Sequence, residues 1–273
     1  MSDLTALRDL YQPLQPSIEA DPAASMNYRE YPPSDALGAS VYCYWRLWPQ
    51  TERQSPYRYR IVSDGCIDLL LNCSTFGGMV VAGTADAASL VELERDADYF
   101  GIRFLPGGFH CFFSEPLKHL ANRMLPSREA WGNRLAELET RLFEPQSVSG
   151  RIAAAESFLL QRLKEKNPKP GERRFQAALG SIYRRKGRIS LSGGAIDDIS
   201  PRQLRRLFHR HVGVAPKTFA RIVRFQSALR ALARPYNRDA STLHLDFGYY
   251  DQPHFIHEFN RFYGLSPSAA LFS

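Results

Sequence analysis

Basic and amide side chains gather around two short segments of the chain that share one motif. The first segment, residues 208–216, reads Phe-His-Arg-His-Val-Gly-Val-Ala-Pro, and the second, residues 259–267, reads Phe-Asn-Arg-Phe-Tyr-Gly-Leu-Ser-Pro. The Phe, Arg, Gly and Pro of the two copies are each 51 residues apart. A repeat at a fixed offset indicates one supersecondary unit built twice. Arg and Gln side chains can reach the edges of DNA bases in the major groove, so DNA recognition is the chemistry to test.

Each copy of the motif closes a predicted helix. Ser200 can cap the first helix, and Pro201 fits its first position, where a backbone N–H is not needed. Asp251 can cap the second helix, and Gly213 and Gly264 end the two helices. Apolar positions recur at helical spacing and should be buried: Leu204, Leu207, Phe208 and His211 in the first helix, and Phe255, Phe259 and Phe262 in the second.

The opposite face of each helix is cationic or rich in amides. It carries Arg202, Gln203, Arg205, Arg206, His209 and Arg210 in the first helix, and Gln252, His254, His257 and Arg261 in the second. One such helix is more often the solvated face of an ordinary bundle. Two copies at a fixed offset favour a pair of helices that lie in the major groove.

Shorter helices should precede these two, over residues 190–196 and 242–247, each followed by a tight turn. A helix, a tight turn and a second helix form the helix-turn-helix unit. Between the two units, Pro216 opens a longer helix that runs to Ala233. Its core positions are Phe219, Ile222, Val223, Leu229 and Leu232.

The second unit, residues 248–267, closely resembles the signature of AraC/XylS-type transcriptional regulators, and residues 200–213 resemble the first helix-turn-helix of that family. The resemblance covers about residues 172–273 and implies two helix-turn-helix units joined by a linking helix. The chain departs from the family pattern at a few positions. Gly193 and Gly194 lie inside the first expected helix, Asp197 occupies the turn position that matches Gly248, and His244 replaces a small residue.

Family-matched positions and the outward faces together suggest which residues touch DNA. We expect base contacts from Arg202, Arg205, Arg206, Gln252, His254 and His257. Phosphate contacts position a protein on DNA without reading its sequence. We expect these from Arg210, Arg221, Arg224 and Arg261.

The first 165 residues are predicted to form a β-rich domain. Runs of β-forming residues are separated by Gly, Asp and Asn and predict strands over residues 41–47, 57–62, 66–72, 79–82, 89–93 and 99–105. Helical patterns follow over residues 116–123, 128–143 and 149–166, whereas residues 1–36 are rich in Pro and Ser and should be irregular. Residues 28–143 resemble the N-terminal domain of a subset of the same regulators, through residues 63–72 and 103–108.

The fold class is therefore α+β, with a β-barrel or sandwich and some helices followed by an all-α domain. Residues 166–171 read Lys-Asn-Pro-Lys-Pro-Gly and predict an interdomain linker. We expect a sensor or dimerisation domain over residues 1–165 and a DNA-binding domain over residues 172–273.

Polar residues around one predicted strand suggest a small-molecule site in the N-terminal domain. Asp64, Cys66 and Asp68 cluster there, His110 could join them, and Tyr42, Tyr44, Trp45 and Phe104 could supply aromatic walls. The alternative is a buried Cys beside a turn-capping or ion-paired Asp, in a barrel that is purely structural or dimerising. We expect neither a metal site nor a cofactor, because His110 and His119 are the only histidines before residue 170 and the four cysteines form no CxxC pair.

The excess of basic over acidic residues is confined to the repeat-bearing region. Residues 171–273 hold 17 Lys and Arg against 7 Asp and Glu, whereas the remaining residues hold 18 against 21. This asymmetry indicates a polyanionic partner for the C-terminal region alone. The sequence has no run of 18 apolar residues and no basic start followed by an apolar core, so we expect a cytoplasmic protein without a membrane helix.

These observations predict a sequence-specific DNA-binding transcriptional regulator that is not an enzyme. Its expected partners are double-stranded DNA and a small-molecule effector, with RNA polymerase and a second copy of the chain as further candidates and no membrane. Two alternatives stay open. One is an architectural protein that binds DNA without sequence preference, and the other is a metal-dependent enzyme with a DNA-binding tail.

Overall fold

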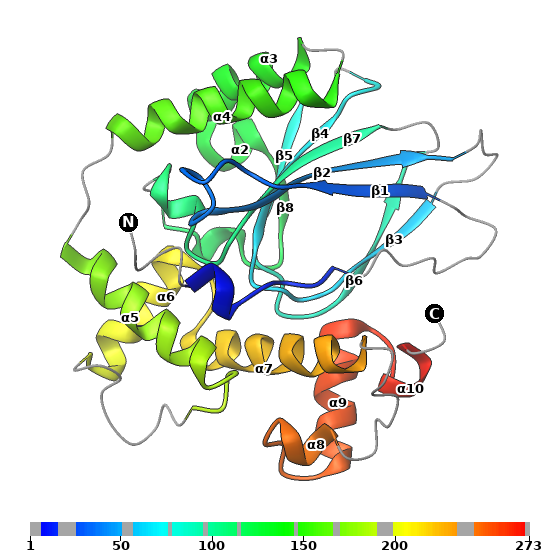
Figure 1. Cartoon of the computed structure of the whole chain (residues 1–273), viewed down its shortest axis with the longest axis vertical. Coiled ribbons are helices and arrows are strands. Elements are labelled where there is room, and N and C mark those ends of the chain that lie inside the picture. Colours follow the sequence, from blue (N-terminus) through cyan, green and yellow to red (C-terminus); the bar gives the residue numbers. More distant parts are fainter. Residues whose placement is uncertain are drawn as a thin grey trace.

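The computed structural model describes residues 7–15, 26–50, 57–75, 78–94, 98–113, 116–144, 147–165, 170–189, 199–233 and 243–270. Within these residues, a β-rich N-terminal half packs against a helical C-terminal half (Figure 1). The α+β fold class predicted from the sequence is therefore confirmed.

Antiparallel strands form two sheets in the N-terminal half. The larger sheet has the order β1-β2-β7-β4-β5-β8, built from Met26–Tyr31, Val41–Pro49, Tyr99–Phe104, Ile67–Asn72, Met79–Ala82 and Met124–Pro126. The smaller sheet pairs β3 (Tyr57–Ile61) with β6 (Ser89–Leu93). The predicted strands over residues 41–105 are all present, with ends that differ by at most a few residues.

Alternation along β4 gives the larger sheet two different faces. Ile67, Leu69 and Leu71 are buried in the main core, which also contains Phe100 and Phe158. Asp68 and Leu70 point the other way and line a cavity between the two sheets. Because side chains alternate between the faces of a strand, β4 contributes to both the core and the cavity, as do β2, β5 and β7.

Helices cover the core face of the larger sheet (Figure 1). They are α2 (Ser127–Trp131), α3 (Ala136–Phe143) and α4 (Val148–Glu165), with 3-10 turns η1 (Phe109–Cys111), η2 (Lys118–Leu120) and η3 (Gly132–Leu135). The predicted helix over residues 128–143 is interrupted, because Gly132, which ends α2 and begins η3, adopts φ 60°.

Two predictions about the N-terminal half are wrong. Residues 116–123 form only the short turn η2, because the backbone turns at Asn122, with φ 59°, and continues into β8 beside β5. Residues 1–36 are not irregular throughout, because β1 lies at the sheet edge and pairs with β2 from Met26 opposite Pro49 to Tyr31 opposite Tyr44.

The C-terminal half consists of helices that bury the predicted apolar faces. They are α5 (Pro170–Arg184), α6 (Pro201–His211), α7 (Pro216–Leu232), α8 (Leu243–Asp246), α9 (Gln252–Tyr263) and α10 (Pro267–Ala270). All the residues predicted to be buried in α6, α7 and α9 are buried. The predicted helix over residues 190–196 and its turn, like residues 166–169 of the predicted linker, lie outside the described residues.

The N-terminal half packs closely along α7. The side chain of Gln226 is only 2% exposed, and its amide nitrogen donates to the carbonyl oxygens of Ser63 at 2.9 Å and Leu14 at 3.2 Å. Its amide oxygen accepts a hydrogen bond from the backbone N–H of Leu14 at 2.8 Å. Tyr11, from the same N-terminal segment, stacks on Tyr183 of α5 with 4.6 Å between ring centres. Residues 7–15 thus lie between the two halves (Figure 1).

Candidate nucleic-acid interface

The two helices that end in the repeated motif, α6 and α9, begin in the same way. The hydroxyl of Ser200 accepts a hydrogen bond from the backbone N–H of Gln203 at 3.3 Å, and the carboxylate of Asp251 accepts one from His254 at 2.8 Å. Each cap satisfies an N–H group that the first turn of a helix leaves without a partner. Both caps were predicted from the sequence, and so was the left-handed Gly264, which ends α9 with φ 86°.

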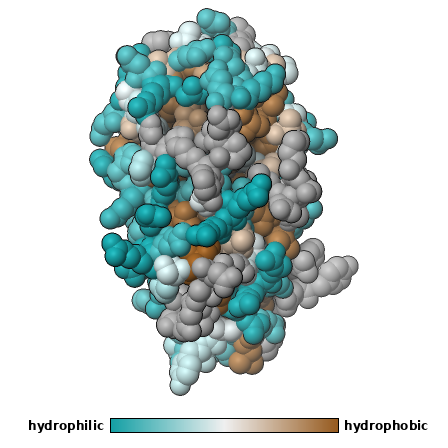
Figure 2. Space-filling model, turned by 90° about the vertical axis from the view of Figure 1, so that its left-hand side faces the viewer, coloured by the Kyte–Doolittle hydropathy of each residue, from teal (hydrophilic) through white to brown (hydrophobic). Residues whose placement is uncertain are grey.

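The residues predicted to contact DNA bases lie on the outward faces of α6 and α9. Arg202, Arg205, Arg206, Gln252 and His257 are exposed, and His254 is partly buried. The side of the molecule that carries α5 and α6 is largely hydrophilic, with smaller hydrophobic patches between (Figure 2). The base-reading roles themselves stay predictions.

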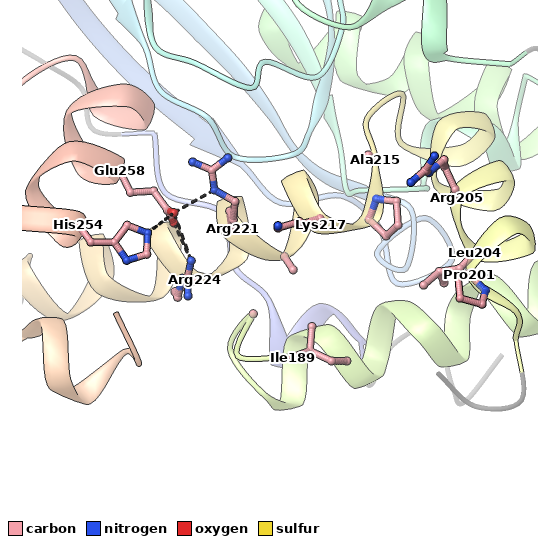
Figure 3. Close-up of a pocket in the computed structure, with 13 residues that line it drawn as sticks. Ile189, Pro201, Leu204, Arg205, Ala215, Lys217, Arg221, Arg224, His254 and Glu258 are labelled. Atoms are coloured by element: carbon pink, nitrogen blue, oxygen red, sulfur yellow. Dashed lines mark hydrogen bonds and ion pairs between the residues drawn. The ribbon is translucent and has the colours of Figure 1, made fainter. Parts of the chain in front are cut away.

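A groove of about 620 Å³ lies between α6 and α9, with α7 along its floor (Figure 3). Basic side chains from all three helices line it: Arg205, Lys217, Arg221, Arg224 and His254. Glu258 is the acidic residue among its lining residues. A positive groove between two exposed helices suits a polyanion, and Lys217 is a basic residue of this site that the sequence analysis did not select.

Glu258 is the second residue that the sequence analysis missed. Its side chain is only 1% exposed, and its carboxylate lies 2.9 Å from Nε of Arg221, 3.1 Å from Nη2 of Arg224 and 3.4 Å from Nε2 of His254. A buried carboxylate is stable only when cations and hydrogen bonds compensate its lost hydration. In the sequence, Glu258 is an acidic residue at a buried position of α9, and this placement indicates that basic partners must lie nearby.

The four predicted phosphate contacts occupy different environments. Arg224 is held by Glu258 and lies 4.5 Å from the ring centre of Tyr249, whereas Arg221 is 30% exposed. Arg261 forms an ion pair with Asp86 of the N-terminal half at 3.4 Å. Arg210 is partly buried near the end of α6. Arg261 is exposed, Arg221 and Arg224 line the groove, and all four roles stay predictions.

The N-terminal half holds the C-terminal ends of both helices. At the end of α6, the carbonyl oxygens of Arg210 and Val212 accept hydrogen bonds from the Leu117 N–H at 3.2 Å and the Thr84 hydroxyl at 2.6 Å. At the end of α9, the carbonyl oxygens of Arg261 and Phe262 accept from the N–H groups of Ala88 at 2.8 Å and Ser63 at 3.0 Å. The last carbonyl groups of a helix have no partner within the helix, so these contacts complete it.

The candidate ligand residues of the N-terminal half are only partly brought together. Asp64, Cys66 and Asp68 line a cavity of about 70 Å³ between the sheets, together with Arg103. Nε of Arg103 lies 3.1 Å from Asp68 and 3.7 Å from Asp64. Burial raises the pKa of Asp68, and the Arg103 guanidinium opposes that shift. Burial also raises the pKa of the Cys66 thiol well above its usual value, so Cys66 is a neutral thiol at pH 7.

His110 does not reach this cavity. It lies in η1 against the C-terminal half, and its ring centre is 4.2 Å from that of His211. Of the aromatic residues expected around the ligand, Trp45 lines the cavity and donates to Asp68 at 2.7 Å. Tyr44 and Phe104 are buried on the opposite face of the sheet, in the main core. Asp64 accepts a hydrogen bond from the Cys66 N–H at 2.9 Å, as the turn-capping alternative predicted.

The described residues contain no group of three or more His, Cys, Asp or Glu side chains arranged to hold a metal ion. Within the same residues, no helix is both long enough and apolar enough to cross a membrane. The four cysteines are free thiols.

Comparisons with known proteins agree with the geometry of the C-terminal half. Residues 197–271 match a family described as a helix-turn-helix domain, and residues 29–126 match a domain family of unknown function, DUF6597. The C-terminal region is therefore a helix-turn-helix domain of the AraC type, a domain that binds DNA. The N-terminal region carries the DUF6597 domain.

Several solved structures show a distant similarity to the whole chain. A crystal structure of ToxT from Vibrio cholerae O395 is 13% identical and has a TM-score of 0.35, over 92% of this chain and 98% of that one. Apo ToxT K231A from Vibrio cholerae strain SCE256 is 12% identical with a TM-score of 0.38, over 92% and 98% of the two chains. No curated protein matches the chain.

Proposed function

We propose that the protein is a sequence-specific transcriptional regulator that reads two successive major-groove segments on one face of a DNA duplex. The observation that carries this proposal is the pair of exposed, capped helices, α6 and α9, on either side of one basic groove. Recognition helices of paired units lie about 34 Å apart, one turn of DNA. Arg202, Arg205 and Arg206 would read bases from α6, and Gln252, His254 and His257 would read bases from α9.

The groove between the helices would receive the DNA backbone. Lys217 and Arg221 line it and would contact phosphates. Arg210, partly buried near the end of α6, would add a further phosphate contact. Arg221 and Arg224 are already paired with Glu258, and Arg261 with Asp86, so their contacts with phosphate would have to be added to these ion pairs. Such contacts would make binding weaken steeply with salt, because they release counterions from the DNA.

Selection of bound sites from random duplexes tests the proposal, and Arg206 tests its detail. Arg206→Ala should weaken binding to the selected site by about 1–3 kcal/mol and relax the base preference in one half of that site. Arg221→Ala, the control, should weaken all duplexes about equally, because a phosphate carries no sequence information. Equal binding of every duplex by the wild-type chain would support the architectural alternative, and identical specificity profiles for the two variants would contradict the assigned roles.

We further propose that a small-molecule effector bound between the two sheets controls DNA binding. The cavity there is small, so a ligand of ordinary size would have to displace its walls. Two of those walls contact the recognition helices. Ser63 lies between the lining residues Val62 and Asp64, and its N–H binds the end of α9. Thr84 lies between the lining residues Gly83 and Ala85, and its hydroxyl binds the end of α6. Displacement of either wall would therefore shift a recognition helix.

A thermal-shift screen of metabolites, followed by DNA titrations, tests the effector. A ligand of this cavity should change DNA affinity by about 1–3 kcal/mol, which is typical of coupling between two sites. Asp68→Asn should weaken binding of the ligand. Asn72→Asp, on the same strand but outside the cavity lining, should leave ligand binding unchanged. A ligand that stabilises the protein and leaves DNA affinity unchanged would exclude the coupling and favour a structural or dimerising domain.

RNA polymerase and a second copy of the chain stay proposed partners, and the absence of enzymatic activity stays a prediction.

A further inference from the structure

The buried carboxylate of Glu258 joins three basic groups from two helices. Glu258 and His254 belong to α9, and Arg221 and Arg224 belong to α7. The dashed contacts of Figure 3 converge on this single carboxylate at the edge of the basic groove. The two arginines exceed the one acid in charge, so the cluster stays attractive to a phosphate even with Glu258 ionised.

Arg224 connects the linking helix α7 to the second helix-turn-helix unit. Besides Glu258, Arg224 donates to the carbonyl oxygen of Gly248 at 3.4 Å, and its guanidinium lies over the ring of Tyr249. Gly248 and Tyr249 form the turn between α8 and α9. One side chain of α7 therefore contacts both the turn and the recognition helix of the unit.

Arg221 has a different arrangement. Its Nε donates a hydrogen bond to the Glu258 carboxylate at 2.9 Å. Within the described residues, this is the one hydrogen bond that the Arg221 side chain makes. Its guanidinium is planar, so fixing Nε also fixes the direction of the two terminal nitrogens. The side chain is 30% exposed and lines the groove, where the terminal nitrogens have donors to offer to an outside acceptor.

We propose that Glu258 is a positioning residue for DNA binding, which orients Arg221 toward a phosphate and fixes α9 on the linking helix. The inference rests on the proposed function. In the first unit, Leu207 occupies the position 51 residues before Glu258 and is buried in an apolar core. The first recognition helix is held by apolar packing at this position, and the second is held by an ion cluster.

The competing view is that Glu258 only opposes DNA through its negative charge, and the two views predict opposite signs. If Glu258 orients Arg221, Glu258→Gln should weaken binding about tenfold, the scale of a hydrogen bond to a charged group. If Glu258 merely repels phosphate, the same variant should bind more tightly. Glu258→Asp keeps the charge but shortens the reach, so it should also weaken binding under the proposal and have little effect under the competing view.

The experiment uses the full chain and the duplex that the wild-type chain selects, in a titration at several salt concentrations. Arg221→Ala, Glu258→Gln and their double variant form a mutant cycle, and Glu92→Gln, which removes an exposed acid on β6, controls for net charge. The double variant should lose less than the sum of the two single losses, because part of the Glu258→Gln loss acts through Arg221, and Glu258→Gln should lower the salt slope as Arg221→Ala does. Thermal unfolding of each variant confirms that it is folded, and Glu258→Asp replaces Glu258→Gln in the cycle if Glu258→Gln does not fold.

Tighter binding by Glu258→Gln, or losses that add fully in the double variant, would overturn the positioning role. A wild-type chain that prefers no duplex would overturn the proposed function itself, and with it this inference. The two failures are distinguishable because selection by the wild-type chain precedes the mutant cycle.

Discussion

Replacing Arg103 with methionine is expected to destabilise the protein by about 3–5 kcal/mol, the cost of removing one partner from a buried ion pair. Arg103 is 4% exposed and lies between Asp64 and Asp68 in the cavity of the N-terminal half. Methionine fills much of the same volume but leaves both carboxyl groups without the guanidinium. Urea unfolding of the variant and the wild type at pH 7 measures the difference.

The loss should shrink as the pH falls. Burial already raises the pKa of Asp68, and removal of Arg103 takes away the cation that opposes this shift. A carboxyl group with a raised folded-state pKa binds a proton more readily in the folded state than in the unfolded state, so the folded state gains stability as the pH falls through that pKa. The deficit of the variant at pH 5 should therefore be smaller than its deficit at pH 7.

A second substitution separates the ion pair from simple packing. In the Arg103→Met background, Asp68→Asn removes a buried charge and keeps a group that can accept the hydrogen bond from Trp45. The double variant should be more stable than Arg103→Met alone at pH 7 and should lose most of its pH dependence. An Arg103→Met deficit that is the same at both pH values would show that Arg103 acts through packing and not through charge.

Phe259→Ala is expected to cost about 3–5 kcal/mol as well, because it removes a large side chain from a closed core. Phe259 is fully buried, and its ring centre lies 5.3 Å from Phe225, 5.7 Å from Phe255 and 5.2 Å from Tyr263. The surrounding rings come from α7 and α9 and cannot close the space without moving a helix. The free energy of unfolding in urea gives the loss directly.

The repeat supplies a matched partner for this test. Phe208 occupies the corresponding position in the first unit, is equally buried, and contacts Phe175 and Phe219. Phe208→Ala should therefore cost a similar amount. Tyr250→Ala, at a side chain that is 92% exposed, should change stability by no more than about 0.5 kcal/mol. A loss at Tyr250 as large as that at Phe259 would contradict the assignment of the core.

Strands and helices with a strong local pattern could be predicted from the sequence, and elements that depend on distant partners could not. The strands at residues 79–82 and 89–93 have turn-forming neighbours and were predicted with their observed ends. β1 contains apolar side chains only in part and is held mainly by its backbone pairing with β2, which leaves little pattern to detect. Leu117 and Leu120 have the spacing of a helix face, but a single 3-10 turn is enough to place both side chains in the core.

The same distinction between local pattern and distant partners applies to the residues of the candidate sites. Outward faces of α6 and α9 follow from periodicity, so the candidate base-reading residues were placed correctly on the surface of these helices. Glu258 was missed because its role requires two arginines that lie 34 and 37 residues away on another helix. His110 was grouped with Asp64 and Cys66 through its residue type, whereas the fold places it against His211.

The hydrogen bonds from the N-terminal half to the ends of α6 and α9 have a consequence for how the protein is made. Ribosomes release the N-terminal region first, and domains generally fold as units during synthesis. We therefore expect the recognition helices of this chain to complete their last turns on an N-terminal surface that has already folded. Gly65 is part of this fit, since a Cβ atom there would lie 2.7 Å from the ring of Phe219. A reading domain taken from another regulator would have to match these contacts, because helix-end carbonyl groups that are buried without partners cost stability.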